Sequence, residues 1–239
     1  MPEIVYVLLL SLLAGAAMPA GALLARLDLI WPSVLGASWR HFIVAFGGGA
    51  LISAVALVLV PEGTSKLSTI PATLCFAAGG AFFYLLDSYL NKLKSSAGQL
   101  VAMLSDFIPE AIALGAAFAV GGSAGLLLAL LMVLQNLPEG FNAYEELSES
   151  SKLSPNKIVA AFSSLALAGP ISAAIGYYLL SQHDELMGAL MLFASAGILY
   201  LIFQDIAPEA KLKNHGMPAL GAVSGFMLGL VGNMLIMGG

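Results

Sequence analysis

Long apolar segments recur through nearly the whole chain, and this recurrence restricts the fold more than any other feature. Of the 239 residues, 59% are hydrophobic and 10% are charged, whereas about 25% of a soluble domain is charged. A helix of about 20 apolar residues crosses a bilayer. The expected fold class is an all-α integral membrane protein, one domain with eight spans, near residues 3–26, 38–60, 70–91, 98–120, 122–144, 156–181, 186–206 and 217–238.

The basic residues support this number of spans. Lys66 lies on one side of the predicted membrane, and the other eight Lys and Arg residues lie on the opposite side: Arg26, Arg40, Lys92, Lys94, Lys152, Lys157, Lys211 and Lys213. Because basic loops stay in the cytoplasm, both termini are expected outside. Residues 3–26 lack a basic leader region and are expected to be a span. The compact loops favour the plasma membrane of a bacterium or archaeon.

Two of the predicted spans carry the same unusual motif, a polar residue followed three positions later by Pro-Glu. The fourth span has Asp106 and Glu110, and the fifth has Gln135 and Glu139, with no Lys or Arg in either segment. Residues four apart share one helix face, so each pair points the same way. Carboxylates inside a membrane are costly and usually mark the path of an ion or proton. The motifs therefore predict an ion site between these two spans.

The prolines and the short connection suggest how the two spans are arranged. Pro109 and Pro138 each lack an N–H group, so we expect both helices to break or bend there. A connection of one or two residues near Gly121 makes the spans antiparallel neighbours. Pro-Glu also recurs at residues 61–62 in span 2 and 208–209 in span 7. Pairing span 2 with span 7 and span 4 with span 5 predicts two inverted repeats.

Taken together in this order, these motifs resemble the ZIP family of divalent-metal transporters (Zrt-, Irt-like proteins). The matching segments are Ile112-Ala113-Leu114-Gly115 after Pro109-Glu110, Pro138-Glu139-Gly140, Phe83-Tyr84-Leu85-Leu86-Asp87 and Gln204-Asp205-Ile206-Ala207-Pro208-Glu209. The resemblance implies a ZIP-like bundle in which spans 1, 4, 5 and 6 carry the ion past spans 2, 3, 7 and 8. It also implies a homodimer. Activity as an enzyme and a resident cofactor are not expected.

The resemblance also suggests the metal ligands. The family pattern His-Asn/Ser-x-Pro-Glu-Gly reads Asp106 to Ala111 here, and His/Gln-Glu/Asp-x-Pro-Glu-Gly reads Gln135 to Gly140. The expected primary site is Asp106, Glu110, Gln135 and Glu139, with Asn136 as a further candidate ligand. A second site common in the family is expected to be missing, because Phe107, Asn136 and Gly169 stand at its ligand positions.

These departures bear on the cargo and the partners. The three histidines, His41, His183 and His215, fall in loops or at interfaces, so no imidazole is expected at mid-membrane. Zinc prefers nitrogen and sulfur, whereas oxygen donors suit Mn²⁺, Fe²⁺, Mg²⁺ or Ca²⁺. Zinc, manganese, iron and cadmium remain candidate cargoes. The partners are this ion, membrane lipid and a second copy of the chain, and no nucleic acid.

Several alternatives stay open on sequence alone. The chain could be a ZIP relative that has lost transport and acts as a metal sensor or scaffold, or it could be an unrelated cation exchanger. The acids could be protonated or hydrogen-bonded residues that hold helices together, and Gln135 and Asn136 could be interhelical amides. Asp87, close to Lys92, is interpreted as an interfacial or ion-paired acid.

Overall fold

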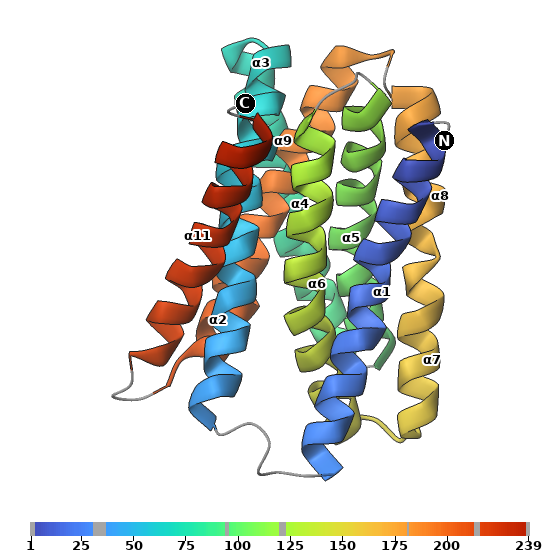
Figure 1. Ribbon diagram of the computed structural model, residues 1–239, viewed down its shortest axis with the longest axis vertical. Helices are drawn as coiled ribbons and strands as arrows, with labels where there is room; N and C mark the ends of the chain where they lie inside the picture. Colours follow the sequence, from blue (N-terminus) through green and yellow to red (C-terminus); the bar gives the residue numbers. More distant parts are fainter. Residues whose placement is uncertain are drawn as a thin grey trace.

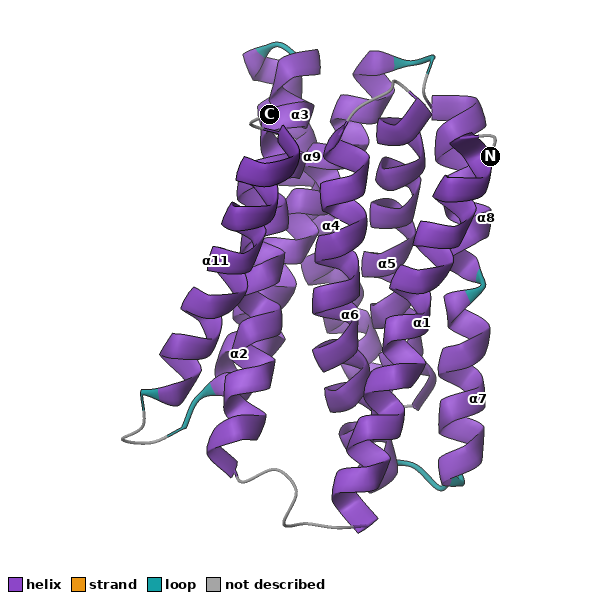
Figure 2. Ribbon diagram, viewed as in Figure 1, coloured by secondary structure: helices purple, strands orange, loops and turns teal. Residues whose placement is uncertain are grey.

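The described part of the chain is almost entirely helical. The computed structural model describes residues 3–30, 37–93, 96–119, 123–180, 182–212 and 216–237, and no strand occurs among them (Figure 2). Seven helical stretches in this part are long and apolar enough to cross a membrane. The chain is therefore an all-α, multi-pass membrane protein.

The helices follow the predicted spans closely. In chain order they are α1 (Glu3–Ile30), α2 (Ala37–Ala54), η1 (Val55–Leu59), α3 (Val60–Lys66), α4 (Thr69–Leu93), α5 (Ser96–Ala119), α6 (Ser123–Ser150), α7 (Pro155–Ala166), α8 (Ala168–Ile175), η2 (Gly176–Leu180), α9 (Asp184–Leu201), η3 (Ile202–Ile206), α10 (Ala207–Ala210) and α11 (Met217–Met237). α5 corresponds to the fourth predicted span. It is not one of the seven stretches above, and it runs through the bundle beside α6 (Figure 1).

The two ends of the bundle differ in charge. α1 begins and α11 ends at the same end (Figure 1). At the opposite end α1 and α6 finish and α2 and α7 start, and this end holds Arg26, Arg40, Lys152 and Lys157. We call it the basic end. Lys66, in α3, lies at the other end, where its Nζ contacts Asp184 Oδ1 at 3.1 Å.

The expected breaks at Pro109 and Pro138 are not observed, because α5 and α6 continue through both residues. A proline removes one helical hydrogen bond, and neighbouring helices can hold the rest of the turn in place. The interruptions lie elsewhere. The sixth span has a turn at Leu167 between α7 and α8, just before Gly169-Pro170.

Wider, π-helical turns occur in spans 2, 6 and 7, and those in spans 2 and 7 each precede a proline. η1 ends two residues before Pro61 and η3 ends two residues before Pro208. The residue just after each π turn donates its N–H to the carbonyl five residues back: Val60 bonds Val55, and Ala207 bonds Ile202. The extra residue in the turn makes room for the proline ring that follows. Spans 2 and 7 thus share one local geometry, and spans 4 and 5 share another.

Close contacts between a glycine and a neighbouring backbone occur within two groups of helices, which correspond to predicted spans 1, 4, 5 and 6 and to spans 2, 3, 7 and 8. The first group comprises α1, α5, α6, α7, α8 and η2. Within it, a Cβ on Gly21 or Gly140 would overlap backbone between α1 and α6, and one on Gly115 would overlap the Ala173 carbonyl of α8. The second group comprises α2, α3, α4, α9, α10, α11, η1 and η3. There, Gly49 lies against backbone of α11, and Gly79 against backbone of α9.

Contacts between the two groups are of another kind. A Cβ on Gly47 of α2 would meet the Pro138 ring of α6 at 2.6 Å, and one on Gly232 of α11 would meet the Leu127 side chain at 2.9 Å. Small residues let helix backbones approach closely in membranes. Within each group, the glycines named above lie directly against the backbone of a neighbouring helix. At the two places between the groups, Gly47 and Gly232 lie against side chains.

Candidate metal centre

An acidic cavity of about 720 Å³ lies in the half of the bundle nearer the basic end. Residues of α2, α4, α5, α6, α9, η3 and α10 line it, and along α6 it extends from Gln135 to Ser150, the last residue of that helix. No Lys, Arg or His occurs among its lining residues in the described part of the chain. Six acids line it: Asp87, Asp106, Glu139, Glu146, Asp205 and Glu209.

Three of the predicted ligands face this cavity. Asp106 of α5 is 6% exposed, Gln135 of α6 is 1% exposed, and Glu139 is half-buried one helical turn beyond Gln135. Helical spacing explains this arrangement, since residues 135 and 139 lie on one face of α6. The structure therefore brings side chains from both motif-bearing helices to one cavity, as the motifs predict.

The fourth predicted ligand, Glu110, lies behind Gln135. It is fully buried and is not part of the cavity lining. Gln135 Nε2 donates a hydrogen bond to Glu110 Oε2 at 2.5 Å, which joins α6 to α5. The other oxygens, Glu110 Oε1 and Gln135 Oε1, are buried and have no hydrogen-bond partner. Nearly all buried polar atoms in proteins have a partner, so two neighbouring exceptions call for a physical explanation.

Asn136 is directed away from the cavity. Its Nδ2 donates a hydrogen bond to the Ala14 carbonyl of α1 at 2.9 Å, and the side chain is 1% exposed. Successive helical residues point about 100° apart. The same turn of α6 therefore presents Gln135 to the cavity and Asn136 to α1, where it acts as an interhelical amide.

Phe107, at a position where the ZIP pattern has a metal ligand, is packed among small residues. The side chain is 1% exposed. A Cβ on Gly169 would meet its ring at 2.8 Å, and one on Gly15 would meet it at 3.1 Å. The ring therefore fills the space that these two glycines leave between α1, α5 and α8.

The carboxylates do not converge on a single point. In the described ranges, no three His, Cys, Asp or Glu side chains lie close enough together to hold a metal ion. Glu110 contacts Gln135, while Asp106 and Glu139 line the adjoining cavity wall. Tight ligation of an ion by all four side chains would require them to move closer together.

Sequence reasoning missed part of the cavity wall. Asp87 lines the cavity, and its Oδ2 accepts a hydrogen bond from the Tyr200 hydroxyl at 2.9 Å. The Lys92 side chain lies outside the described residues. Glu146 also lines the cavity, and a signal for it was present, because it lies seven residues, about two turns, after Glu139. Asp205 and Glu209 also line the cavity. Their ZIP-like segment made them candidates for an exit relay or for a solvated helix end, and the sequence did not place them opposite Gln135 and Glu139.

No family model and no curated protein matches this chain. The resemblance to the ZIP family therefore rests on the residue patterns themselves.

The chemistry of the cavity is that of a cation-binding site. Its polar donors at the deep end are carboxylate and amide oxygens, which are hard ligands. The described lining contains six acids and no basic residue, so the charge that the cavity can carry is negative. This combination attracts cations and disfavours anions.

Proposed function

We propose that this protein moves a divalent metal cation across a plasma membrane through one mainly oxygen-ligated site between α5 and α6. The observation that carries the proposal is a pair of buried oxygens without partners, Gln135 Oε1 on a residue that lines the acidic cavity and Glu110 Oε1 on the residue bonded to it. A bound cation would satisfy both oxygens. Asp106 and Glu139, on the adjoining wall, would complete the set of ligands.

Electrostatics supports this reading over a purely structural role. Acids within a membrane protein are expensive unless they are paired or have an ion to bind. Here the nearest described polar partner of Glu110 is the neutral Gln135, which leaves one oxygen of each side chain without a bond. Oxygen donors favour Mn²⁺ or Fe²⁺ over Zn²⁺. We therefore place manganese and iron ahead of zinc and cadmium as cargo.

The distribution of charge supports one orientation. Under the positive-inside rule, the basic end faces the cytoplasm, so the cavity is accessible from that side. With α5 as the eighth crossing, both termini then lie outside. The compact loops fit a bacterial or archaeal inner membrane.

The two helix groups support an elevator-type movement. The close contacts between glycines and backbone inside each group favour movement of each group as a unit. The side-chain contacts described between the groups can break and re-form more easily than these backbone contacts. The shared π turns before Pro61 and Pro208, together with the uninterrupted helices through Pro109 and Pro138, fit two inverted repeats. The homodimer that the ZIP resemblance implies remains a prediction.

The proposal can be tested by Mn²⁺ uptake into liposomes that contain the purified full chain. We expect Glu110→Gln and Glu139→Gln each to reduce the initial rate at least tenfold. Glu149→Gln is the matched control, since Glu149 is an exposed residue of α6 outside the cavity lining, and it should keep the rate within about twofold. Competition by Fe²⁺, Co²⁺, Zn²⁺, Cd²⁺ and Mg²⁺ then ranks the cargo ions.

Each other outcome has a defined meaning. Uptake that survives both substitutions contradicts the proposed site. Mn²⁺ binding without uptake by the unaltered protein supports a transport-inactive metal sensor, which the separated carboxylates keep as the second candidate.

A further inference from the structure

The Gln135 side chain connects Glu110 to the cavity. Glu110 is fully buried and does not line the cavity, whereas Gln135 lines the cavity and bonds Glu110 directly. Gln135 thus stands between the open space and the most deeply buried acid.

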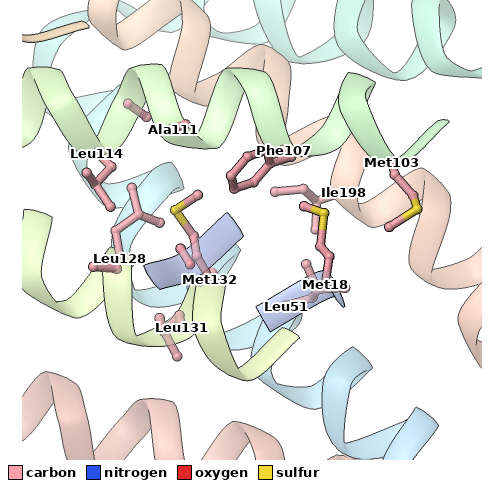
Figure 3. Packing of buried hydrophobic residues seen from close by; sticks show 14 of the residues in the cluster. Met18, Leu51, Met103, Phe107, Ala111, Leu114, Leu128, Leu131, Met132 and Ile198 are labelled. Carbon is pink, nitrogen blue, oxygen red and sulfur yellow. The ribbon is translucent and has the colours of Figure 1, made fainter. Parts of the chain in front are cut away.

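The opposite side of this contact is closed by apolar packing. Leu114 of α5 and Leu128, Leu131 and Met132 of α6 are all fully buried. Figure 3 shows Leu114, Leu128 and Met132 grouped between the two helices, whereas Leu131 points to the other side of α6. Among the described residues, Gln135 is therefore the polar side chain that both contacts Glu110 and lines the cavity.

We propose that Gln135 is the inner gate of the ion site as well as one of its ligands. This inference rests on the proposed function and adds a step to it. When the site is empty, the Gln135 amide donates its N–H to Glu110 Oε2 and occupies the position through which an ion must pass. For an ion to reach Glu110, the side chain must rotate and this hydrogen bond must break.

The same rotation prepares the side chain to bind the ion. Gln135 Oε1 has no partner in the closed arrangement, so turning the amide frees the N–H from Glu110 and lets the oxygen face the ion. The gate therefore exchanges one interaction with Glu110, a hydrogen bond, for two interactions with the cation.

The gate predicts a specific kinetic effect. The hydrogen bond between Gln135 and Glu110 must break before an ion enters, and breaking a buried hydrogen bond slows entry by up to about tenfold. Gln135→Ala removes both the obstruction and the bond, so Mn²⁺ association should become about tenfold faster. Dissociation should also become faster, because a ligand is lost. A residue that is a ligand alone would change dissociation and leave association unchanged.

Two further variants make the test specific. Gln135→Met keeps a side chain of similar length but cannot bond Glu110, so it should also accelerate association even if Gln135→Ala packs poorly. Asn142→Ala removes an amide that lines the cavity two turns further along α6, and it should leave association within about twofold.

The experiment uses the purified full chain in detergent. Equilibrium dialysis gives the dissociation constant for Mn²⁺, stopped-flow capture by a fluorescent chelator gives the dissociation rate, and their ratio gives the association rate. Faster association in both Gln135 variants supports the gate. Unchanged association with faster dissociation overturns the gate and leaves the carrier intact. Absence of Mn²⁺ binding by the unaltered chain at millimolar concentrations overturns the proposed function, and the gate with it.

Discussion

Two adjacent amides of α6 have different surroundings despite their similar chemistry. Gln135 contacts Glu110 and the cavity, and Asn136 contacts the Ala14 carbonyl of α1. The sequence made both residues candidate ligands, because both occupy ligand positions of the ZIP pattern, although Asn136 stands where the family has an acid. The rotation of the helix by about 100° per residue separates them, and this rotation relative to α1 and α5 is set by tertiary packing.

At the residue scale, we expect Asn136→Ala to affect stability and not ion binding. Loss of the hydrogen bond to Ala14 should cost about 1 kcal/mol, the usual range for interhelical hydrogen bonds in membranes. Mn²⁺ affinity should stay within about twofold. Thermal unfolding in detergent and equilibrium dialysis measure the two quantities. A tenfold loss of affinity with unchanged stability would instead identify Asn136 as a ligand.

At the element scale, hydropathy predicted the helices well and proline position predicted their interruptions poorly. The predicted spans are helical where they are described, and seven helical stretches are long and apolar enough to cross a membrane, because crossing hydrocarbon demands a long apolar segment with all its backbone groups bonded. The effect of a proline depends on what packs around it. Pro138 is buried against Gly47 and its helix continues, whereas Pro61 and Pro208 follow π turns.

The same dependence on packing limited prediction of the site. Spacing along one helix correctly placed Gln135 and Glu139 on the same face of α6. Whether Asp87, Asp205 and Glu209 point into the cavity depends instead on how α4, η3 and α10 are rotated about their axes. Residue spacing within α6 carries no information about those rotations. The sequence therefore identified the wall formed by α5 and α6 and missed the wall opposite.

Also at the element scale, close packing predicts different outcomes for two Gly-to-Ala changes. Gly115→Ala should lower stability by about 1–3 kcal/mol, because the added methyl group would overlap the Ala173 carbonyl between α5 and α8. Gly80→Ala, in α4, is the matched control and should be close to neutral, since nothing lies within 4 Å of its added Cβ. Thermal unfolding of both variants in one detergent is the measurement. Equal stability for the two variants would contradict the glycine seam within the first group.

At the scale of the whole molecule, an ion pair between described residues joins the two helix groups near the basic end. Arg40 Nη1 of α2 contacts Glu145 Oε1 of α6 at 2.9 Å, with both side chains partly buried. The bonds from Gln135 to Glu110 and from Asn136 to Ala14 lie within the first group, and the Tyr200–Asp87 bond lies within the second. If the groups slide past each other during transport, the Arg40–Glu145 contact must break.

We therefore expect Arg40→Gln and Glu145→Gln to shift the population away from the arrangement described here. An ion pair of this exposure contributes about 0.2–1 kcal/mol, so the shift should be up to about fivefold. A cysteine introduced as Asn142→Cys in a Cys75→Ser background reports cavity access from the basic end, and its labelling should slow in either variant. The double variant should be no slower than the single ones. Additive effects, or an effect that persists unchanged in high salt, would contradict a direct ion pair.

The location of a bound metal is the most direct test of the proposed site between α5 and α6. Crystals of the purified chain grown with Mn²⁺, with anomalous diffraction recorded at the manganese edge, locate the ion without reference to transport rates. We expect one strong anomalous peak between α5 and α6. It should lie within ligand distance of Glu110 and Gln135 oxygens and adjacent to Asp106 and Glu139. A fully occupied peak elsewhere in the bundle, with no density at this position, would contradict the proposed site.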